Sequence, residues 1–364
     1  MRADHLGHLR TAQRRGCWLD ECAEHARQQG GFVNINLLLH RFFNGFLWLA
    51  LPLLLAPVAW ALADWAVFSA VFRPDLQACQ QAAGQGACWG VVAEKWRVIL
   101  FGRYPLEEQW RAGIVLLLWS VLLFATAARL FKSKTAFSLW ALLLPASSVL
   151  LHGGVAALPT VPTNLWGGLP LTLILSTVGF ALALPLAVLL ALGRQSAFAP
   201  LRRFCITYIE LLRALPLVTV LFLAAFVLPL WLPGEGLDLF TRVLFTIALF
   251  SAAYLAEVLR GGLQAVPAGQ GQAAKALGLN RVQRNVHVVL PQAIRACLPS
   301  LINSFVTLFK ECSLVTIVAL FELTGALSLA LAGDVQWRSF YLEGYLFIGL
   351  VYWAYCFGLS KTVK

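Results

Sequence analysis

The chain has 364 residues, of which 60% are hydrophobic and only 12% are charged, and its formal net charge is +11 at pH 7. Soluble domains carry roughly a quarter charged residues, so this composition excludes an ordinary soluble protein and indicates an integral membrane protein. The 13 Trp and 24 Phe fit apolar helices with aromatic belts at the membrane surface.

Eight apolar stretches are each long enough for a membrane-spanning helix of about 20 residues. Two prolines, Pro185 and Pro216, are expected to kink the helices that contain them. We therefore expect an all-α fold, a polytopic membrane helix bundle. The stretches cover about residues 43–70, 112–131, 137–158, 166–193, 205–232, 241–262, 293–319 and 340–359.

Lys and Arg collect on one side of the expected spans. If both termini are cytoplasmic, 19 of the 28 Lys and Arg residues lie in cytoplasmic segments and 7 lie on the opposite side. Cytoplasmic loops are enriched in Lys and Arg, so this split predicts a multi-pass protein with both termini in the cytoplasm. Topology and contact with anionic membrane lipid explain the net charge, and no nucleic-acid partner is expected.

Three regions follow from the order of the stretches. Residues 1–42 are expected to form a cytoplasmic N-terminal segment, and residues 43–160 a three-helix extension with an outward loop at 72–110. Residues 161–364 form a second helical domain with a long polar insertion at 263–291. Two closely spaced prolines at 159–164 oppose helix continuation and mark the junction.

The polar insertion predicts two short helices joined by a tight turn. Residues 268–277 are strong helix formers that follow Pro267, and Gly278 stands where a left-handed C-terminal cap is favoured. Asn280 can cap a second short helix over residues 281–285. Such an element could seat in a groove of a partner protein or rest as an amphipathic helix on anionic lipid, and its chemistry alone favours neither.

The sequence QAAKALGLNRVQRNVHVVLP at 272–291 resembles the EAA loop of the membrane subunits of ABC importers. The alanine pair, the glycine four residues after the second alanine, and the final Leu-Pro all match. Gln272 departs from the family's Glu and lacks the charge that a salt bridge to the ATPase would need. By this resemblance, the residues of the ATPase-coupling loop are Gln272, Ala273, Ala274, Leu277, Gly278 and Arg281.

Four wider blocks are similar to permeases of the polar amino acid uptake family, and the resemblance covers roughly residues 165–360. Glu257 and Arg260 fall within one of these blocks and are expected to form a local ion pair that braces the loop. The blocks are GLPLTLILSTVGFALALPLAVLLALGR from Gly168, YIELLRALPLVTVLF from Tyr208, AYLAEVLRGG from Ala253, and NSFVTLFKECSLVTIVALFEL from Asn303.

The segment GACWGVVAEKWRVILFGRYPLEEQW at 86–110 resembles the AapM and BztC type, membrane subunits of broad-specificity or glutamate/aspartate uptake systems. The resemblance implies a type I importer in the bacterial inner membrane, in which this chain forms half of a heterodimeric pore for L-amino acids. The implied partners are a second, homologous permease, two identical ABC ATPase subunits and a periplasmic amino acid-binding protein.

ATP hydrolysis is not expected of this chain itself. The sequence contains no Gly-Lys dipeptide, so the phosphate-binding GxxxxGK[ST] loop is absent. We expect ATP-Mg to be bound by the partner ATPase, and this chain to be a transport subunit with no catalytic residues and no cofactor of its own.

Polar groups within the expected spans are candidates for the substrate pathway, because charges at membrane depth usually face a cavity or a partner. Adjacent helical residues point apart, so Lys310 and Glu311 cannot line one narrow face together. We favour Lys310 and Ser313 toward the substrate, where a cation suits the carboxylate shared by all amino acids, and Glu311 paired to a neighbouring helix. The candidates are Arg213, Lys310, Glu311 and Ser313.

An alternative interpretation gives these charges a structural role. Arg213 and Lys310 would then pair with carboxylates such as Glu210 and Glu311 of this or a partner subunit, because intramembrane charges commonly pair with one another.

The cysteines divide by position. Cys79 and Cys88 share the outward loop, where an oxidising periplasm allows either a disulfide or two free thiols. The N-terminal His and Cys residues match no standard zinc spacing, and no metal is expected there or elsewhere. They are His5, His8, Cys17, Cys22 and His25.

Two other function classes compete with the importer subunit. A stand-alone secondary amino acid transporter would need its own ion-coupling carboxylates and often shows two halves of matching pattern, which this sequence lacks. A membrane-embedded enzyme would need a metal or nucleophile cluster at membrane depth, and the sequence shows none.

Overall fold

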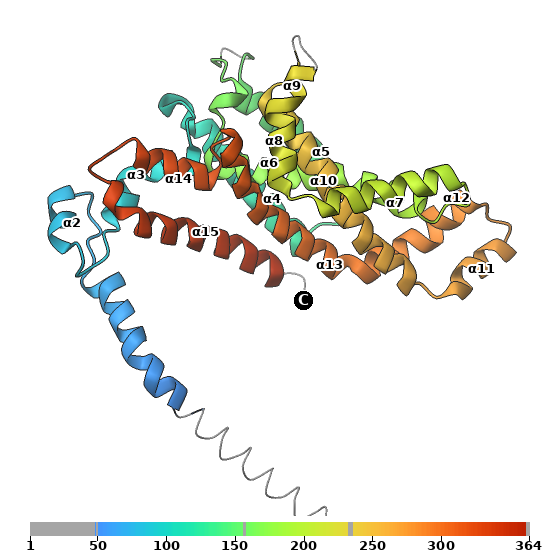
Figure 1. The fold of residues 1–364 in the computed structure, drawn as a ribbon, viewed down its shortest axis with the longest axis horizontal. Helices are drawn as coiled ribbons and strands as arrows, with labels where there is room; N and C mark the ends of the chain where they lie inside the picture. Colours follow the sequence, from blue (N-terminus) through green and yellow to red (C-terminus); the bar gives the residue numbers. More distant parts are fainter. Residues whose placement is uncertain (1–47, 49, 156–157, 232–235, 362–364) are drawn as a thin grey trace, which may run out of the picture. The chain divides into compact units, whose positions relative to one another are not determined.

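The computed structural model describes Trp48 and residues 50–155, 158–231 and 236–361. The chain divides into two compact units, one of residues 1–70 and 82–87, the other of residues 71–81 and 88–364. Within the described residues, helices dominate (Figure 1) and β structure is limited to two isolated bridges, Val71 with Cys88 and Gly168 with Glu322.

Seven described helices are long and apolar enough to cross a membrane, and a bent pair makes eight if that pair is one span. Each of the seven overlaps one predicted stretch, so the predicted polytopic helix bundle is confirmed. The seven are Ala50–Phe68, Leu106–Ala127, Lys134–His152, Gly168–Gly193, Leu239–Ala265, Arg281–Val318 and Arg338–Lys361.

The first unit contains the helix Ala50–Phe68, whose last turn is the π-helical η1 (Asp64–Phe68). None of its apolar window is buried inside the unit, and the side chain of Trp60 is 68% exposed. Apolar side chains that stay exposed along a whole helix are typical of a surface that faces lipid.

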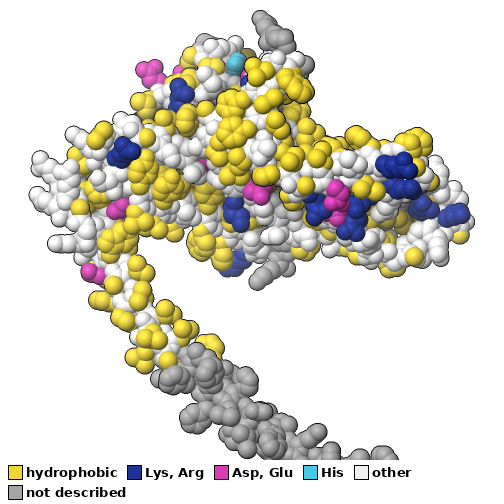
Figure 2. Space-filling view, viewed as in Figure 1, with side chains coloured by type: hydrophobic (Ala, Val, Ile, Leu, Met, Phe, Trp, Pro, Cys, Tyr) yellow, Lys and Arg dark blue, Asp and Glu magenta, His cyan; other side chains and the backbone are white. Residues whose placement is uncertain are grey.

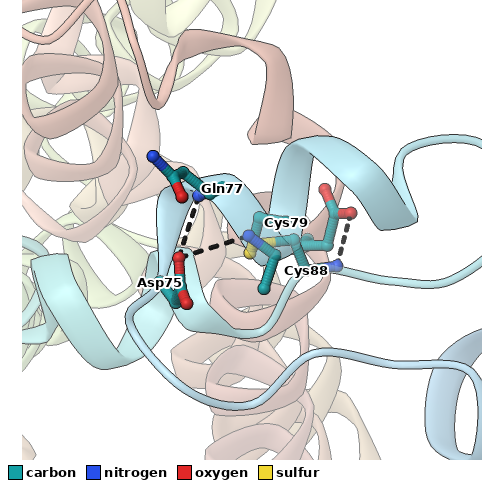
Figure 3. Close-up of a disulfide and its surroundings, with 6 residues drawn as sticks. Asp75, Gln77, Cys79 and Cys88 are labelled. Atoms are coloured by element: carbon teal, nitrogen blue, oxygen red, sulfur yellow. Dashed lines mark hydrogen bonds between the residues drawn. A yellow bond between two sulfur atoms is a disulfide. The ribbon is translucent and has the colours of Figure 1, made fainter.

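The second unit begins with a short segment before the long helices. Asp75 accepts hydrogen bonds from the backbone N–H groups of Gln77 (2.9 Å) and Ala78 (3.2 Å) and so caps the helix that carries Cys79 (Figure 3). The elements of this region are α2 (Leu76–Ala82), α3 (Gly90–Phe101), η2 (Leu106–Glu108), α4 (Gln109–Ala127) and α5 (Ser133–His152).

Buried Arg111 ties α4 to the chain that follows α5. Its guanidinium donates to the carbonyl oxygens of Leu150 (3.3 Å) and Pro159 (3.2 Å), and its Nε lies 2.9 Å from Oε2 of Glu108. The side chain is fully buried, so these partners replace the water that a buried cation would lose.

The rest of the unit is built around α6 and α10, which pack closely against one another and against α13. Helix α6 continues through Pro185 as a single span. The proline that we expected to kink this helix therefore does not interrupt it. The elements are η3 (Thr163–Leu165), α6 (Gly168–Gly193), α7 (Ala199–Ala214), α8 (Leu217–Phe222), η4 (Leu223–Val227), α9 (Leu228–Trp231), α10 (Leu239–Ala265), α11 (Ala268–Ala276), α12 (Arg281–Arg284), η5 (Asn285–Val289), α13 (Leu290–Glu311), η6 (Cys312–Val318), α14 (Leu323–Ala332), η7 (Arg338–Phe340) and α15 (Tyr341–Lys361).

The predicted span at 205–232 is present only as a bent pair of helices, and the expected kink at Pro216 is a full break. Helix α7 and the following α8–α9 segment meet at an angle of 103° (Figure 1). Leu215 and Pro216 both have extended backbone, because proline disfavours the helical conformation of the residue before it and cannot donate a backbone hydrogen bond. Glu210 and Arg213 therefore lie on α7, beside a break rather than inside a straight span.

Glu322 fixes the start of α14, a short apolar helix that the sequence analysis missed. Its Oε1 accepts from the backbone N–H groups of Thr324 (2.8 Å) and Gly325 (3.0 Å), and its Oε2 accepts from the hydroxyl of Tyr352 on α15 (2.9 Å). The carboxylate is fully buried, and these donors, with hydroxyls of Thr172 on α6 and Thr316 on η6, satisfy it.

Candidate functional site

The α11–α12 loop, residues 268–284, has the two-helix form that the sequence predicts. Gly278 has φ of +80°, its N–H donates to Lys275 O (3.0 Å), and the N–H of Leu279 donates to Ala274 O (3.2 Å). This is a Schellman cap, which favours glycine at the left-handed position. Asn280 begins α12 with a capping box to Gln283.

Most residues predicted for the coupling loop lie on the surface. Leu277 is 82% exposed and Val282 is 70% exposed, while Ala274 is buried. Gln272, Ala273 and Arg281 are exposed as well. Arg281 Nη2 also donates to the carbonyl oxygen of Gln195, in the α6–α7 connection, at 2.9 Å. The loop therefore combines exposed apolar side chains with a firm attachment to the helix bundle.

Positive charge surrounds this loop. Figure 2 shows Lys and Arg side chains gathered over the end of the second unit that carries α7, α11 and α12, with Asp and Glu among them.

A cavity of about 230 Å³ lies between α6, α10 and α13. Phe180 of α6 and Phe250 of α10 supply aromatic walls, and the remaining lining is mostly polar. Pockets with an apolar wall and a few convergent polar groups are the usual form of a small-molecule site. The polar lining residues are Ser251, Tyr254, Asn303, Ser304, Thr307 and Glu311.

The structure reverses the expected arrangement of the charges on α13. Glu311 lines the cavity, whereas neither Lys310 nor Ser313 does. Among the described residues, no ion pair or hydrogen bond reaches the Glu311 carboxylate, so the expected pairing with a neighbouring helix is absent there. The Lys310 side chain is exposed on another side of the helix. The cavity therefore offers a carboxylate, and no lining cation, to a bound molecule.

Glu257 on α10 is the centre of an ionic cluster between the cavity and the α11–α12 loop. Its Oε1 pairs with Nη1 of Arg194, and its Oε2 lies 2.9 Å from Nε of Arg260 and 3.9 Å from Nη1 of Arg213. Arg194 Nη1 also lies 3.5 Å from Oε1 of Glu210. The predicted Glu257–Arg260 ion pair is present.

Arg213 pairs with a carboxylate of the same chain, as the alternative interpretation expected, but the carboxylate is that of Glu257 and not that of Glu210. Its guanidinium also lies over the ring of Tyr254, 5.8 Å from the centroid, and the Tyr254 hydroxyl approaches Arg213 O at 3.5 Å. Arg213 thus touches the wall of the cavity from outside without lining it.

Cys79 and Cys88 form a disulfide beside α3, and Glu343 of α15 accepts the Cys88 backbone N–H at 3.0 Å (Figure 3). Nearby, Lys95 Nζ lies 2.8 Å from Oδ2 of Asp334. This hydrogen bond holds the pKa of the Asp334 carboxyl below its usual value. The disulfide closes the segment before α4 on itself, and the bonds from Cys88 and Lys95 fasten that segment to the start of α15 and the end of α14.

Metal ligation finds no support in the part of the chain that the structure describes, where no group of three His, Cys, Asp or Glu could hold an ion. The N-terminal histidines and cysteines lie outside the described residues.

A model of the family described as "Binding-protein-dependent transport system inner membrane component" matches residues 183–360. The chain is 39% identical over 304 residues to the inner membrane amino-acid ABC transporter permease protein YhdY of Escherichia coli K12, and the match covers 82% of each protein. The chain belongs to the permeases of amino acid ABC transporters. The predicted resemblance is thereby confirmed, and the permease is a multi-span inner membrane protein.

Two further relatives delimit the match. The permease is 33% identical over 334 residues to the glutamate/glutamine/aspartate/asparagine transport system permease protein BztC of Rhodobacter capsulatus, covering 76% of the permease and 77% of BztC. It is also 33% identical over 206 residues to the arginine transport system permease protein ArtQ of Bacillus subtilis, covering 88% of ArtQ but only 54% of the permease. A large part of the permease therefore lies outside the region that matches ArtQ.

Sequence reasoning missed two features of this site. Arg194 follows the last turn of α6 and gave no signal of its own, because its partners Glu210 and Glu257 are distant in sequence. The polar cavity lining was also missed, although Asn303, Ser304 and Thr307 share the helical spacing with Glu311 and could have indicated one polar face.

Proposed function

We propose that the permease is a membrane subunit of an ATP-driven importer of L-amino acids, that it forms half of the translocation pathway, and that it couples this pathway to separate ABC ATPase subunits. The α11–α12 loop carries the proposal. It is exposed, apolar at Leu277 and Val282, and rigid because of its Schellman cap and capping box. A small, exposed and capped pair of helices is better suited to bind in a groove of another protein than to serve only as a connection between two spans.

The proposed partners are two ATPase subunits that bind ATP-Mg, a second homologous permease, and a periplasmic amino acid-binding protein. Both termini are then cytoplasmic, on the side of the α11–α12 loop. The matched family is named for binding-protein-dependent transport, which supports the periplasmic partner. The named relatives are all permease proteins of transport systems, which favours this reading over a stand-alone secondary transporter or an enzyme.

The substrate we propose is an L-amino acid, of the broad or glutamate/aspartate type that the similarity to BztC suggests. The lining of the cavity is suited to groups that all amino acids share. The unpaired carboxylate of Glu311 suits the ammonium group that every amino acid carries, and the hydroxyl and amide groups around it can bond to the rest of the molecule. In this arrangement Glu311, and not Lys310, is the pathway residue of α13.

The experiment uses Gly278. Replacement by Val places a β-branched residue at φ of +80°, where left-handed backbone costs an L-residue about 1–2 kcal/mol. In the reconstituted complex of all its subunits, Gly278→Val should break the link between ATP hydrolysis and uptake while the permease still inserts. Gly269→Val is the matched control, because Gly269 lies in α11 without positive φ and with open space at its Cβ. Unchanged transport in Gly278→Val would argue against the coupling role.

A further inference from the structure

The cavity and the α11–α12 loop are joined by an unbroken series of polar contacts. The series starts at Tyr254, which lines the cavity and lies against Arg213. Arg213 contacts Glu257, and Glu257 binds Arg194. The residue after Arg194 is Gln195, whose carbonyl oxygen accepts from Arg281 of the loop at 2.9 Å. The series runs from α10 to α7 and back to α10, then to the α6–α7 connection and, through the peptide bond between Arg194 and Gln195, to α12.

Glu257 is the carboxylate on which three arginines converge, Arg194, Arg213 and Arg260. Its side chain is 16% exposed, and three guanidinium groups lie within 4 Å of its two oxygens. Without this carboxylate, three cations would meet in a partly buried space with only Glu210 left near them. Like charges repel, so the close approach of the three arginines depends on the Glu257 carboxylate that lies between them.

The contacts to Glu257 are unequal. Those of Arg194 and Arg260 are short, and Arg260 lies on the same helix. That of Arg213 is long, at 3.9 Å, and the Arg213 side chain is 38% exposed. Arg213 stands beside the 103° break between α7 and α8. We take the contact between Arg213 and Glu257 as the weakest link of the series, because it is the longest of the three and the most exposed.

We infer that Glu257 is a positioning residue for coupling: it holds Arg194, next to the attachment of the α11–α12 loop, and Arg213, next to the cavity wall, so that displacement of the loop moves Tyr254. This inference rests on the proposed function and names the residues through which the loop acts. Mere proximity does not establish coupling, so the test must measure coupling itself.

The test uses the complete complex in proteoliposomes with its loaded binding protein. Two quantities are measured together, uptake of labelled L-glutamate, L-glutamine and L-arginine, and stimulated ATP hydrolysis. Glu257→Gln keeps the size of the side chain and removes its charge. We expect the ratio of ATP hydrolysed to amino acid transported to rise roughly 2- to 30-fold, the range for substitutions along a coupling network. Glu257→Asp, which restores the charge, should recover part of the ratio.

Controls separate coupling from structural support. Asp334→Asn breaks an ion pair of the same kind at Lys95, far from the loop in sequence, and should leave the ratio unchanged. Arg213→Gln removes only the link to the cavity wall, and it should raise the ratio of ATP hydrolysed to amino acid transported. This variant tests the inference even if the complex that carries Glu257→Gln fails to assemble. The double variant Arg213→Gln with Arg281→Ala should raise the ratio by less than the product of the single effects, because both cut one series.

The inference is overturned if uptake and hydrolysis fall in proportion in Arg213→Gln and Glu257→Gln, or if neither changes. A wild-type complex whose hydrolysis does not respond to the loaded binding protein would overturn the proposed function, and this inference with it.

Discussion

Gly179 of α6 lies directly against Ile247 of α10: a Cβ atom on Gly179 would sit 2.8 Å from Ile247 Cγ2. The absence of that atom lets the two central helices approach closely. The packing of α6 on α10 also positions Phe180, next in the chain, as one wall of the cavity. A substitution at Gly179 thus reports on the bundle and on the site together.

Gly179→Val should destabilise the permease by about 1–3 kcal/mol, the usual cost of overpacking a close contact. The methyl group of a β-branched isoleucine has few alternative positions, so the helices themselves must separate. Thermal unfolding of the purified complex measures the effect. Gly349→Val on α15 is the control, since nothing lies within 4 Å of its Cβ position. Equal unfolding temperatures for the two variants would contradict this account of the α6–α10 contact.

Local signals in the sequence were sufficient to predict the α11–α12 loop in detail. Pro267, Gly278 and Asn280 each act on their immediate neighbours, and the structure confirms the helix starts and the left-handed turn. The rotation of α13 about its axis could not be predicted in this way, because it depends on which helices pack around it. For that reason Glu311, and not Lys310, faces the cavity.

The bend at Pro216 could be predicted from the sequence only in part. The sequence indicates a disturbance at this residue, because proline restricts its neighbour and lacks an N–H group. The size of the bend, 103°, depends on what α7 and α8 each pack against and has no local signal. The same limitation hid the pairing of Glu257, whose partner Arg194 lies 63 residues away.

The cavity gives a prediction for α13. Glu311→Gln removes the negative charge that we expect to face the substrate ammonium. Since hydrogen bonds to charged groups contribute about 1.5–3 kcal/mol, uptake at low substrate concentration should fall roughly 10- to 150-fold. Lys310→Met should have a much smaller effect, because Lys310 lies outside the lining. Initial rates in proteoliposomes measure both, and a larger loss in Lys310→Met would contradict the assignment.

The disulfide gives a prediction for the segment before α4. Cys79 and Cys88 are separated by 9 residues, and closing a loop of this size contributes about 2.5 kcal/mol on the chain-entropy model. The double variant Cys79→Ser with Cys88→Ser should make this segment more susceptible to proteolysis. A reductant should have the same effect on the wild type and none on the variant. Identical digestion of oxidised and reduced wild type would speak against a stabilising disulfide.

The ion pair between Lys95 and Asp334 gives a prediction for pH. The hydrogen bond from Lys95 lowers the pKa of Asp334 below its ordinary value of 3.8, so the folded state holds this proton less tightly than the unfolded state. The pair therefore stabilises fully above the unfolded pKa, and its contribution disappears as pH falls through the lower folded pKa. The difference in unfolding temperature between wild type and Asp334→Asn should shrink between pH 5 and pH 3. A difference that widens on acidification would refute this sign.

The continuous span Arg281–Val318 connects the α12 part of the α11–α12 loop to the residues of α13 that line the cavity. It runs for 38 residues, through α12, η5, α13 and η6, and so measures roughly 57 Å at 1.5 Å per residue. Glu311 lies 30 residues beyond Arg281, roughly 45 Å along the helix, so a tilt of about 5° about the Arg281 end displaces Glu311 sideways by roughly 4 Å. A small tilt imposed on the loop end of this helix therefore changes the width of the cavity at its other end.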